Sequence, residues 1–514
     1  MATKTPVKKT APKAAAAGGE PKAAKKVSAP KAKSRAQKSG IHILYAVSEC
    51  RPFAATGGLA EVAGSLPGAM AALPGFFVTV AMPLYSEIAD AERAQMRLLT
   101  EFTAELGWRK QYCGIYTLER GGVRYLFIGN DYYFKRAGLY GHYDDGERFA
   151  FFSKAVIDAV LKLDLRPDII HCNDWQTALI PVYMRTNYAD EQRLSNVKTL
   201  LTVHNIEYQG KYALSILEDV FGISDRYAPA LEYNGLVNLL KGAAELSDGV
   251  STVSPTYARE LESPYFSHGL HHVFVRNRAK VTGILNGIDT EDYNPETDPA
   301  LFKNFSAADL AGKAENKRML RQMLNLPDTS DAPLIAMITR LVPHKGVDLV
   351  REALDEIMQL GVQFVLLGKG DTVYENYFSD MQNVYSSRLR SVIAFNADTS
   401  RKIYAGADIF LMPSKSEPCG LSQMIASRYG AVPVVRETGG LHDSIRDIGG
   451  EDGNGFTFSG YSRHELMHRI RAAADMWKND AHGWQQLVKK VMTTDFSWSN
   501  SAQSYAQLYK NLLG

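Results

Sequence analysis

The most restrictive feature of the sequence is a repeated pattern of short apolar, β-branched runs that stop at Gly, Pro, Asn, Asp or Ser. Such runs are typical of strands that are buried on both faces, as in a parallel sheet. The pattern occurs in two series along the chain. The first comprises His42–Val47, Phe77–Ala81, Tyr125–Ile128, Asp168–His171, Thr199–Val203 and Val250–Val253; the second comprises Leu334–Ile338, Phe364–Leu367, Ile409–Met412 and Val432–Val435.

Helical patterns lie between these runs. In Phe152–Leu161 the apolar residues recur at helical spacing, and the same holds for Ala502–Leu513 near the C-terminus. Strands that alternate with helices predict an α/β fold of two doubly wound, Rossmann-like domains facing a central cleft. Because ligands of such sheets bind beyond the carboxyl ends of the strands, we expect the site in that cleft.

The expected domain limits follow from the two series and from the turn-rich stretch Asn294–Asp298. We expect an N-terminal Rossmann-like domain over 41–290 and a C-terminal Rossmann-like domain over 291–490. Residues 491–514 should form a helix that docks back on the first domain. At 45% hydrophobic and 22% charged residues, the 514-residue chain can bury cores of this size.

The net charge of +2 hides an uneven distribution. Residues 1–40 contain eleven Lys and Arg and one acid, Glu20, whereas residues 41–514 carry eight more acids than bases. Rich in Lys, Ala and Pro, the tail is expected to be disordered. A solvated tail, a polyanion-binding segment, an organelle transit peptide and a tether remain alternatives for its role. The acidic body argues against nucleic acid as the main partner.

Other classes are excluded by what the sequence lacks. No apolar run approaches the roughly 20 residues of a membrane span. The four cysteines are far apart and form no CxxC pair, which argues against a zinc site or a disulfide framework. We therefore expect a cytoplasmic protein without a membrane partner, the alternative being a plastid if the tail is a transit peptide.

Two Gly pairs follow predicted strands, Gly57–Gly58 within Ala55–Pro67 and a second pair within Thr438–Leu441. Adjacent glycines let backbone N–H groups approach an anion at the start of a helix. The spacing fits neither a dinucleotide-binding fingerprint nor a P-loop. One such pair is more often a turn, but two at equivalent places indicate phosphate or sugar contacts.

Charged residues follow two strands of the second series. Arg340 and Lys345 lie five residues apart after Leu334–Ile338, and Glu417 precedes Cys419 after Ile409–Met412. Arg and Lys at this spacing suit a diphosphate, and a carboxylate can hold sugar hydroxyls. Without further context, two exposed surface bases would be the simpler interpretation.

In the first series, two predicted strands end in polar and aromatic residues. His171–Trp175 (HCNDW) and His204–Gly210 (HNIEYQG) carry the His, Asp, Asn, Trp and Tyr side chains that suit carbohydrate recognition. The two histidines have no metal-ligand spacing, and a lone buried histidine is more often structural. Neither a Ser-His-Asp arrangement nor a glycosidase-type carboxylate pair is evident.

These motifs resemble, in order and spacing, those of the bacterial glycogen synthases and plant starch synthases, which are retaining glycosyltransferases of the GT-B fold. The resemblance runs from about His42 to Trp498. The motifs are SEC-x-PF, CNDW, TVHN-x-x-YQG, VSPTYARE, LNGID, KAENKR, TRL-x-x-x-KG, EPCGL, TGGL and DFSW.

The resemblance implies transfer of glucose from ADP-glucose to the non-reducing end of an α-1,4-glucan, without a cofactor or a metal. It implies catalytic roles for His204, Arg340, Lys345 and Glu417. Donor-binding residues would be Gly57, Gly58, Asn286, Phe395, Cys419, Gly420, Leu421, Ser422, Thr438 and Gly439. Asp174, Asn205, Tyr208 and Gln209 would orient substrate. Retention without an enzymic nucleophile favours a front-face mechanism with domain closure.

One position departs from the family pattern. The family usually has a donor-binding lysine before the first TGGL, where this chain has Ala55. Loss of one charge-assisted contact corresponds to about 1.5–3 kcal/mol. Weaker activity, compensation by a base such as Lys369, and a changed donor remain open. A catalytically weak or inactive glucan-binding or nucleotide-sugar-binding homologue is the main alternative, and a phosphorylase or sucrose-type synthase is a further one.

Overall fold

A nine-stranded sheet forms the centre of the N-terminal part of the chain. The computed structural model describes residues 40–329, 331–394 and 396–514. The strand order is β12-β11-β7-β6-β1-β2-β5-β4-β3. The pairs are parallel from β12 to β5, whereas β5, β4 and β3 are antiparallel. The bounds are β1 Ile41–Ala46, β2 Phe76–Pro83, β3 Arg97–Leu106, β4 Arg109–Arg120, β5 Val123–Gly129, β6 Ile169–Asn173, β7 Lys198–Val203, β11 Gly249–Thr252 and β12 Val281–Gly283.

A second sheet of six parallel strands occupies the C-terminal part, in the order β15-β14-β13-β16-β17-β18. Counted along the chain, this is the 3-2-1-4-5-6 order of a doubly wound fold. Its strands are β13 Leu334–Ile338, β14 Gln363–Leu367, β15 Leu389–Val392, β16 Ile409–Met412, β17 Val432–Arg436 and β18 Phe456–Phe458. The order reverses between β13 and β16 here, and between β1 and β6 in the first sheet. The loops that follow these four strands therefore lie at the topological switch points of the two sheets, where ligands of such folds bind.

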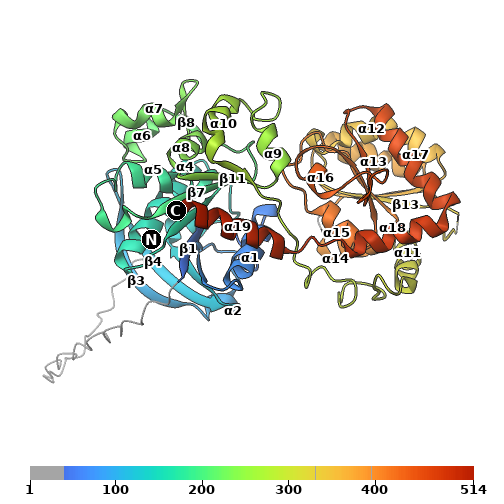
Figure 1. Cartoon of the computed structure of the whole chain (residues 1–514), viewed down its shortest axis with the longest axis horizontal. Coiled ribbons are helices and arrows are strands. Elements are labelled where there is room, and N and C mark those ends of the chain that lie inside the picture. Colours follow the sequence, from blue (N-terminus) through green and yellow to red (C-terminus); the bar gives the residue numbers. More distant parts are fainter. Residues whose placement is uncertain (1–39, 330, 395) are drawn as a thin grey trace, which may run out of the picture. The chain divides into compact units, whose positions relative to one another are not determined.

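Helices cover both sheets (Figure 1). Around the first sheet they are α1 Gly58–Ala71, α2 Asp90–Arg93, α3 Asp131–Phe134, α4 Asp145–Lys162, α5 Leu179–Arg185, α6 Ile216–Asp219, α7 Ala228–Leu231, α8 Leu239–Leu246, α9 Pro255–Glu260 and α10 His271–Asn277. A small sheet of β8 Lys211–Ala213, β10 Leu236–Asn238 and β9 Glu232–Tyr233 lies in this part. Around the second sheet they are α11 Ala311–Met323, α12 Val347–Gln359, α13 Thr372–Val384, α14 Ala397–Gly406, α15 Ser422–Arg428, α16 Gly439–Ser444, α17 Arg463–Asn479 and α18 Ala481–Thr493.

The amphipathic pattern of these helices explains how they cover the sheets. In α12 the apolar residues recur at three- and four-residue spacing, and all of them are buried. They are Val347, Leu349, Val350, Ala353, Leu354, Ile357 and Met358. The strand runs beneath them are buried on both faces, as expected for parallel strands under helices.

The C-terminal helix α19 (Trp498–Leu513) returns to the first sheet and packs against α1 (Figure 1). Tyr505 and Tyr509 are buried on its inner face. The Tyr509 hydroxyl lies 2.7 Å from Nδ1 of His171, which belongs to β6. The docking predicted from the spacing of apolar residues in this segment is thus observed.

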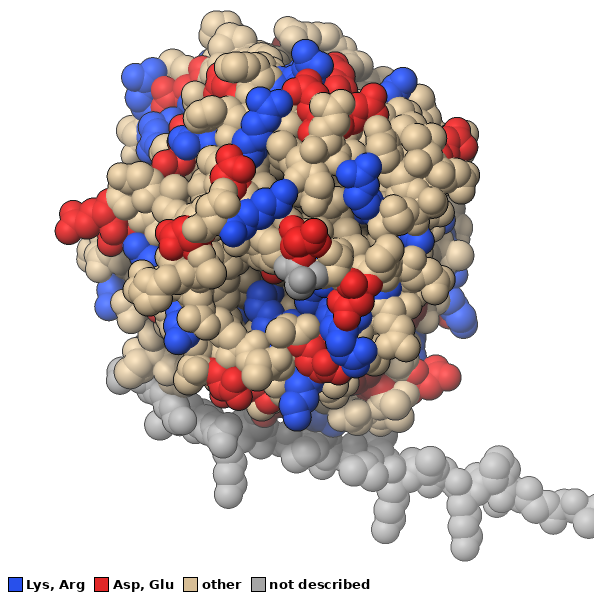
Figure 2. Space-filling view, turned by 90° about the vertical axis from the view of Figure 1, so that its right-hand side faces the viewer, with Lys and Arg blue, Asp and Glu red and all other residues tan. Residues whose placement is uncertain are grey.

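All ten runs predicted as strands coincide with strands of the two sheets. The antiparallel pair β3–β4 was not predicted. The limits 41–290, 291–490 and 491–514 stay predictions, and those made for residues 1–39 lie outside the described part of the chain. Among the residues that the structure describes, none of the helices is long and apolar enough to cross a membrane. On the face in Figure 2, Lys and Arg are interspersed with Asp and Glu.

Candidate active site

A cationic and an anionic side chain meet at the switch point of the second sheet. Lys345 follows β13, and its Nζ lies 2.8 and 2.6 Å from the two carboxylate oxygens of Glu417, which follows β16. The hydroxyl of Ser414 donates a further hydrogen bond of 3.0 Å to Glu417. Residues 72 apart in sequence are therefore paired as the doubly wound topology predicts.

Arg340 lies in the same loop after β13 as Lys345. Its side chain is exposed, and within the described residues no acceptor is hydrogen-bonded to its guanidinium. Burial, with the charges of Lys345 and Arg340, lowers the pKa of the neighbouring His344. An exposed guanidinium beside a lysine leaves donors available for an anion such as a diphosphate.

Gly346 is required by the backbone of this loop. Its φ is +76°, and a Cβ there would lie 2.2 Å from the carbonyl oxygen of Pro413. The close approach brings the loop after β13 against the loop after β16. The Lys415 amide also donates to the His344 carbonyl at 2.9 Å, and both contacts hold the two loops together at Lys345 and Glu417.

The Cys419–Ser422 turn lies next to Glu417. Gly420 has a φ of +70°, and the side chain of Gln423 donates to the carbonyls of Cys419 and Gly420 at 3.2 and 2.9 Å. Leu421 is the N-cap residue of α15, which begins at Ser422. Burial raises the pKa of the Cys419 thiol to about 12, although hydrogen bonds from Asn286 to that thiol lower it.

The second Gly pair packs against backbone. A Cβ on Gly439 would lie 2.0 Å from the Glu417 carbonyl oxygen, and the Gly440 amide donates to that oxygen at 3.1 Å. The Thr438 hydroxyl and the Gly439 amide both donate to Glu260, at 2.8 and 3.0 Å. The polar groups expected to contact the donor are therefore already engaged, and the donor-binding role of Thr438 and Gly439 stays a prediction.

The first Gly pair is different. Gly57 and Gly58 are exposed, and a Cβ on either would meet no atom within 4 Å. The amide and hydroxyl of the preceding Thr56 donate to Glu49 at 2.5 and 2.7 Å. Burial raises the pKa of this carboxyl. This turn at the start of α1 thus keeps open space, which suits the approach of a ligand.

His204 and Asp174 adjoin at the carboxyl ends of β7 and β6. One carboxylate oxygen of Asp174 accepts from the His204 amide at 2.7 Å and from the Asn205 amide at 3.4 Å. Burial raises the pKa of Asp174 to about 7. Burial also lowers the pKa of His204 to about 3, so the imidazole is neutral at neutral pH.

The tautomer of His204 follows from its partner Asn173. The side-chain nitrogen of Asn173 donates to the Ala46 carbonyl at 3.0 Å, which leaves Oδ1 as the acceptor. Oδ1 lies 2.9 Å from Nε2 of His204. The ring proton is therefore assigned to Nε2.

The remaining predicted residues of this loop have different surroundings. Oδ1 of Asn205 accepts from the Glu207 amide at 3.0 Å, and Tyr208 is exposed. The buried Gln209 amide donates to the carbonyls of Ile206 and His268 at 3.0 and 3.1 Å. It also accepts from Asn238 at 2.8 Å. Gln209 thus stabilises the loop, and its substrate-orienting role stays a prediction.

Loops of the first sheet lie near the switch point of the second sheet. The charge of Glu207, in the loop after β7, opposes the lowering of the pKa of His344 in the loop after β13. The hydroxyl of Ser254, which follows β11, donates to the carbonyl of Pro418 at 2.9 Å. Phe395, expected to stack on adenine, lies outside the described residues.

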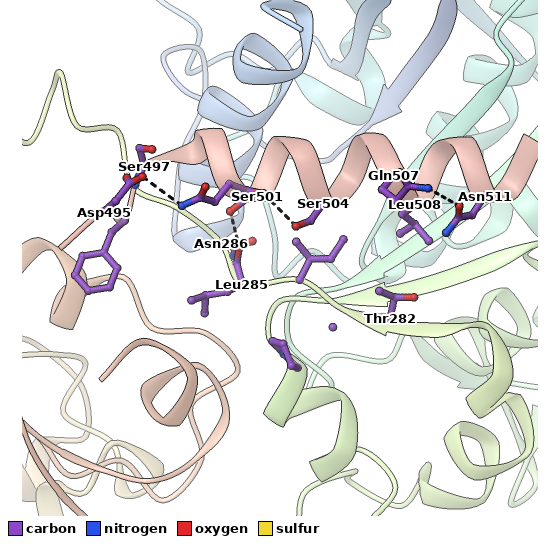
Figure 3. Close-up of a pocket in the computed structure, with 15 residues that line it drawn as sticks. Thr282, Leu285, Asn286, Asp495, Ser497, Ser501, Ser504, Gln507, Leu508 and Asn511 are labelled. Atoms are coloured by element: carbon purple, nitrogen blue, oxygen red, sulfur yellow. Dashed lines mark hydrogen bonds between the residues drawn. The ribbon is translucent and has the colours of Figure 1, made fainter. Parts of the chain in front are cut away.

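A cavity of about 580 Å³ lies along α19 and contains one predicted site residue, Asn286. Ser501, Ser504 and Leu508 of α19 face Thr282 and Leu285 across it (Figure 3). The Ser501 hydroxyl donates to the Leu285 carbonyl at 2.6 Å. The cavity therefore borders the segments that cross between the sheets, whereas Arg340, Lys345 and Glu417 do not line it.

Two acidic residues at the site were not predicted, Glu49 and Glu260. Each binds the backbone amide of a Gly-pair turn. Glu49 lies in the SEC motif and Glu260 ends VSPTYARE, so their place within motifs was the available signal. Across the part of the chain that is described, no group of three or more His, Cys, Asp or Glu side chains is suited to hold a metal ion.

Comparisons with known proteins agree with this architecture. Residues 42–276 match the starch synthase catalytic domain family, and residues 321–490 match the glycosyl transferases group 1 family. Proteins named glycogen synthase from Bacillus cereus and Geobacillus thermodenitrificans are each 44% identical over 92% of this chain. The match covers 100% and 98% of their lengths.

Solved structures of similar proteins agree with these sequence matches. The catalytic domain of starch synthase IV from Arabidopsis thaliana, bound to ADP and acarbose, has a TM-score of 0.85 at 37% identity. The match covers 92% of this chain and 100% of that one. A sucrose-phosphate synthase from Thermosynechococcus elongatus, at 17% identity and a TM-score of 0.56, shares the fold.

The two doubly wound sheets are thus those of a GT-B glycosyltransferase, as the sequence predicted. The chain belongs to the glycogen and starch synthase family.

Proposed function

We propose that this chain transfers glucose from ADP-glucose to the non-reducing end of an α-1,4-glucan with retention of configuration. The observation that carries the proposal is the Lys345–Glu417 pair, with the exposed Arg340 in the same loop as Lys345. The ADP and acarbose on the Arabidopsis relative support a nucleotide-linked donor and a glucan acceptor. The proposed compartment is the cytoplasm.

In this proposal Arg340 and Lys345 bind the diphosphate and stabilise the charge that develops on it. Glu417 accepts hydrogen bonds from glucosyl hydroxyls and holds Lys345 in place. Gly57 and Gly58 give the donor close access to the start of α1. Asn286, Phe395 and the Cys419–Ser422 turn would complete the donor site, with Thr438 and Gly439 beneath it.

The reaction breaks the bond between the anomeric carbon and the diphosphate oxygen. The acceptor hydroxyl oxygen forms its bond to the same carbon from the same face, and its proton passes to the departing phosphate oxygen. His204 is neutral, so it adds no positive charge beside the cationic transition state. Asp174, with Asn205 and Tyr208, would orient the sugar hydroxyls.

The test is incorporation of labelled glucose into glycogen by the purified full chain, with ADP-glucose and UDP-glucose compared. We expect transfer from ADP-glucose and a loss of at least about 100-fold in kcat/KM for Lys345→Gln, since removing one such electrostatic contact costs about 2.7–4 kcal/mol. Lys489→Gln, an exposed lysine of α18, is the matched control. No incorporation from either donor would contradict the proposal.

The alternative of an inactive binding homologue is motivated by Ala55, which is exposed at the turn before α1. In the same assay, Ala55→Lys should lower the KM for ADP-glucose about tenfold, the lower end of one charge-assisted contact. Ala55→Gln, without the charge, should not. A parent without activity and an active Ala55→Lys variant would favour the binding homologue.

A further inference from the structure

Helix α9 connects the first half of the chain to the two turns that flank Glu417. It follows β11 of the first sheet and packs against α16 of the second half. Its N-cap residue Ser254 accepts from the Tyr257 amide at 3.0 Å while its hydroxyl donates to the carbonyl of Pro418. One hydroxyl thus joins the start of α9 to the residue between Glu417 and Cys419.

Two more side chains of α9 reach the second half. The amide and hydroxyl of Thr256 donate to the carboxylate of Asp443 in α16, at 2.8 and 2.6 Å. One carboxylate oxygen of Glu260 accepts from the Thr438 hydroxyl and the Gly439 amide. The other oxygen is buried and has no hydrogen-bond partner among the described residues.

The two turns held by α9 also contact each other. The Gly440 amide donates to the carbonyls of Glu417 and Pro418, both at 3.1 Å. A displacement of the Thr438–Gly440 turn would therefore move the backbone of Glu417, which contacts Lys345. Glu260 is 178 residues from Thr438 in sequence, so its contact with this turn depends on tertiary packing, including that of α9 on α16.

We propose that Glu260 is a positioning residue for the donor, holding the Thr438–Gly440 turn so that Glu417 and the Cys419 turn keep their binding geometry. Ser254 and Thr256 act with it from the same helix. This inference rests on the proposed function insofar as these turns bind the donor nucleotide. Its consequence is that a side chain from the acceptor-side half sets donor affinity.

The hydrogen-bonding chemistry predicts a graded response. Glu260→Gln keeps an oxygen that can accept from both Thr438 and Gly439, loses the charge, and replaces the unpaired oxygen by an amide nitrogen. Glu260→Ala removes the acceptor, so the Thr438 hydroxyl and the Gly439 amide lose their hydrogen-bond partner. Hydrogen bonds to charged groups are stronger than neutral ones, so the alanine variant should be the more affected.

The experiment measures ADP affinity by titration calorimetry, together with the KM values for ADP-glucose and glycogen. Glu260→Ala should weaken ADP binding and raise the donor KM about tenfold, whereas Glu260→Gln should change both about threefold. The KM for glycogen should stay unchanged in both. The control is Glu262→Ala, two residues away and paired with Arg278 at 3.6 Å.

The outcomes separate this inference from the proposed function. A Glu260→Ala variant with the ADP affinity of the Glu262→Ala control would overturn the positioning role. An equal rise in the KM values for ADP-glucose and glycogen would also overturn it, because such a rise indicates a general loss of structure at the site. If the parent binds ADP but transfers no glucose, the proposed function fails, and the ADP affinities still decide the role of Glu260. A parent that binds no ADP overturns both.

Discussion

Asp174 combines an unusual backbone conformation with a buried carboxyl group. It has a φ of +55° and a ψ of −175°, a region that non-glycine residues rarely adopt. Its carboxyl group is buried, and burial raises its pKa to about 7. Both features are unfavourable for folding, and such residues are concentrated at functional sites. The compensation is the pair of backbone hydrogen bonds to His204 and Asn205.

The raised pKa of Asp174 has a defined effect on stability. An unfolded aspartate ionises near pH 4, so between about pH 4 and pH 7 only the folded state retains the proton. The stability conferred by this group is full below about pH 4 and is lost as the pH rises to about 7.

Asp174→Asn removes this ionisation. We therefore expect its thermal midpoint, relative to the parent, to increase by about 2 °C between pH 5 and pH 8 in calorimetry. Transfer activity should fall, because a carboxylate that we propose to orient substrate is lost. Asp164→Asn is the control, since Asp164 also has a positive φ of +48° and is exposed. A difference independent of pH would contradict the assignment.

At the residue scale, the sequence predicted the side chains that follow buried strands but not their partners. His204, Asp174, Lys345 and Glu417 could be selected as candidates because the carboxyl ends of parallel strands converge. Glu260 could not be selected in this way, because its contact with Gly439 depends on how α9 packs on α16. That the two Gly pairs differ, one open and one packed on backbone, is likewise a tertiary property.

At the scale of elements, the ten apolar runs could be predicted as strands because strands covered by helices on both faces are continuously apolar. The pair β3 (Arg97–Leu106) and β4 (Arg109–Arg120) was missed for the opposite reason. Much of β3 is exposed, and its second half, residues 101–106, alternates polar and apolar residues, as antiparallel strands with one solvated face do. A search for continuous apolar runs does not detect such strands.

Lys313 of α11 illustrates how one side chain joins several elements. Its buried ammonium donates to the carbonyls of Ala405, Ala407 and Tyr429, at 3.1, 2.8 and 2.9 Å. These carbonyls lie at the C-terminal ends of α14 and α15, where helices lack internal partners. Burial lowers the pKa of Lys313 to about 7. The residue therefore satisfies two helix ends at once.

Lys313→Met keeps most of the side-chain volume and leaves three buried carbonyls without their donor. We expect a loss of about 3 kcal/mol in the free energy of unfolding, or roughly 3 °C in thermal midpoint for a chain of this size. Calorimetry should show no such loss for Lys303→Met, an exposed lysine near the same helix. Equal midpoints for the two variants would show that the three carbonyls are not stabilised by Lys313.

On the scale of the whole molecule, two chain segments cross between the two sheets, and they are bonded to each other. The Ile288 amide donates to the Phe496 carbonyl at 2.8 Å, and Ser501 donates to Leu285 (Figure 3). A Cβ on Gly287 would lie 2.7 Å from the amide nitrogen of Trp498. The placement of His204 relative to Arg340 thus depends on this contact as well as on α9.

Gly287→Ala should separate the crossing segments by forcing Trp498 away, which costs about 1–3 kcal/mol in overpacking. The charge-assisted contacts with the diphosphate are proposed for Arg340 and Lys345 of the second sheet, whereas transfer requires residues of both sheets in register. We therefore expect ADP affinity to stay within twofold of the parent. The kcat should fall at least about tenfold, because small misplacements at a reacting centre have large effects on rate.

Gly68→Ala provides the matched control, since a Cβ at Gly68 in α1 meets no atom within 4 Å. That variant should keep the parent's kcat. If Gly287→Ala weakened ADP binding as much as it lowered kcat, the crossing segments would shape the donor site itself. If instead Gly287→Ala lowers kcat while Glu260→Ala lowers ADP affinity, the two variants affect two separate structural requirements. The crossing segments would set the register of the two halves, and α9 would set the geometry of the donor turns.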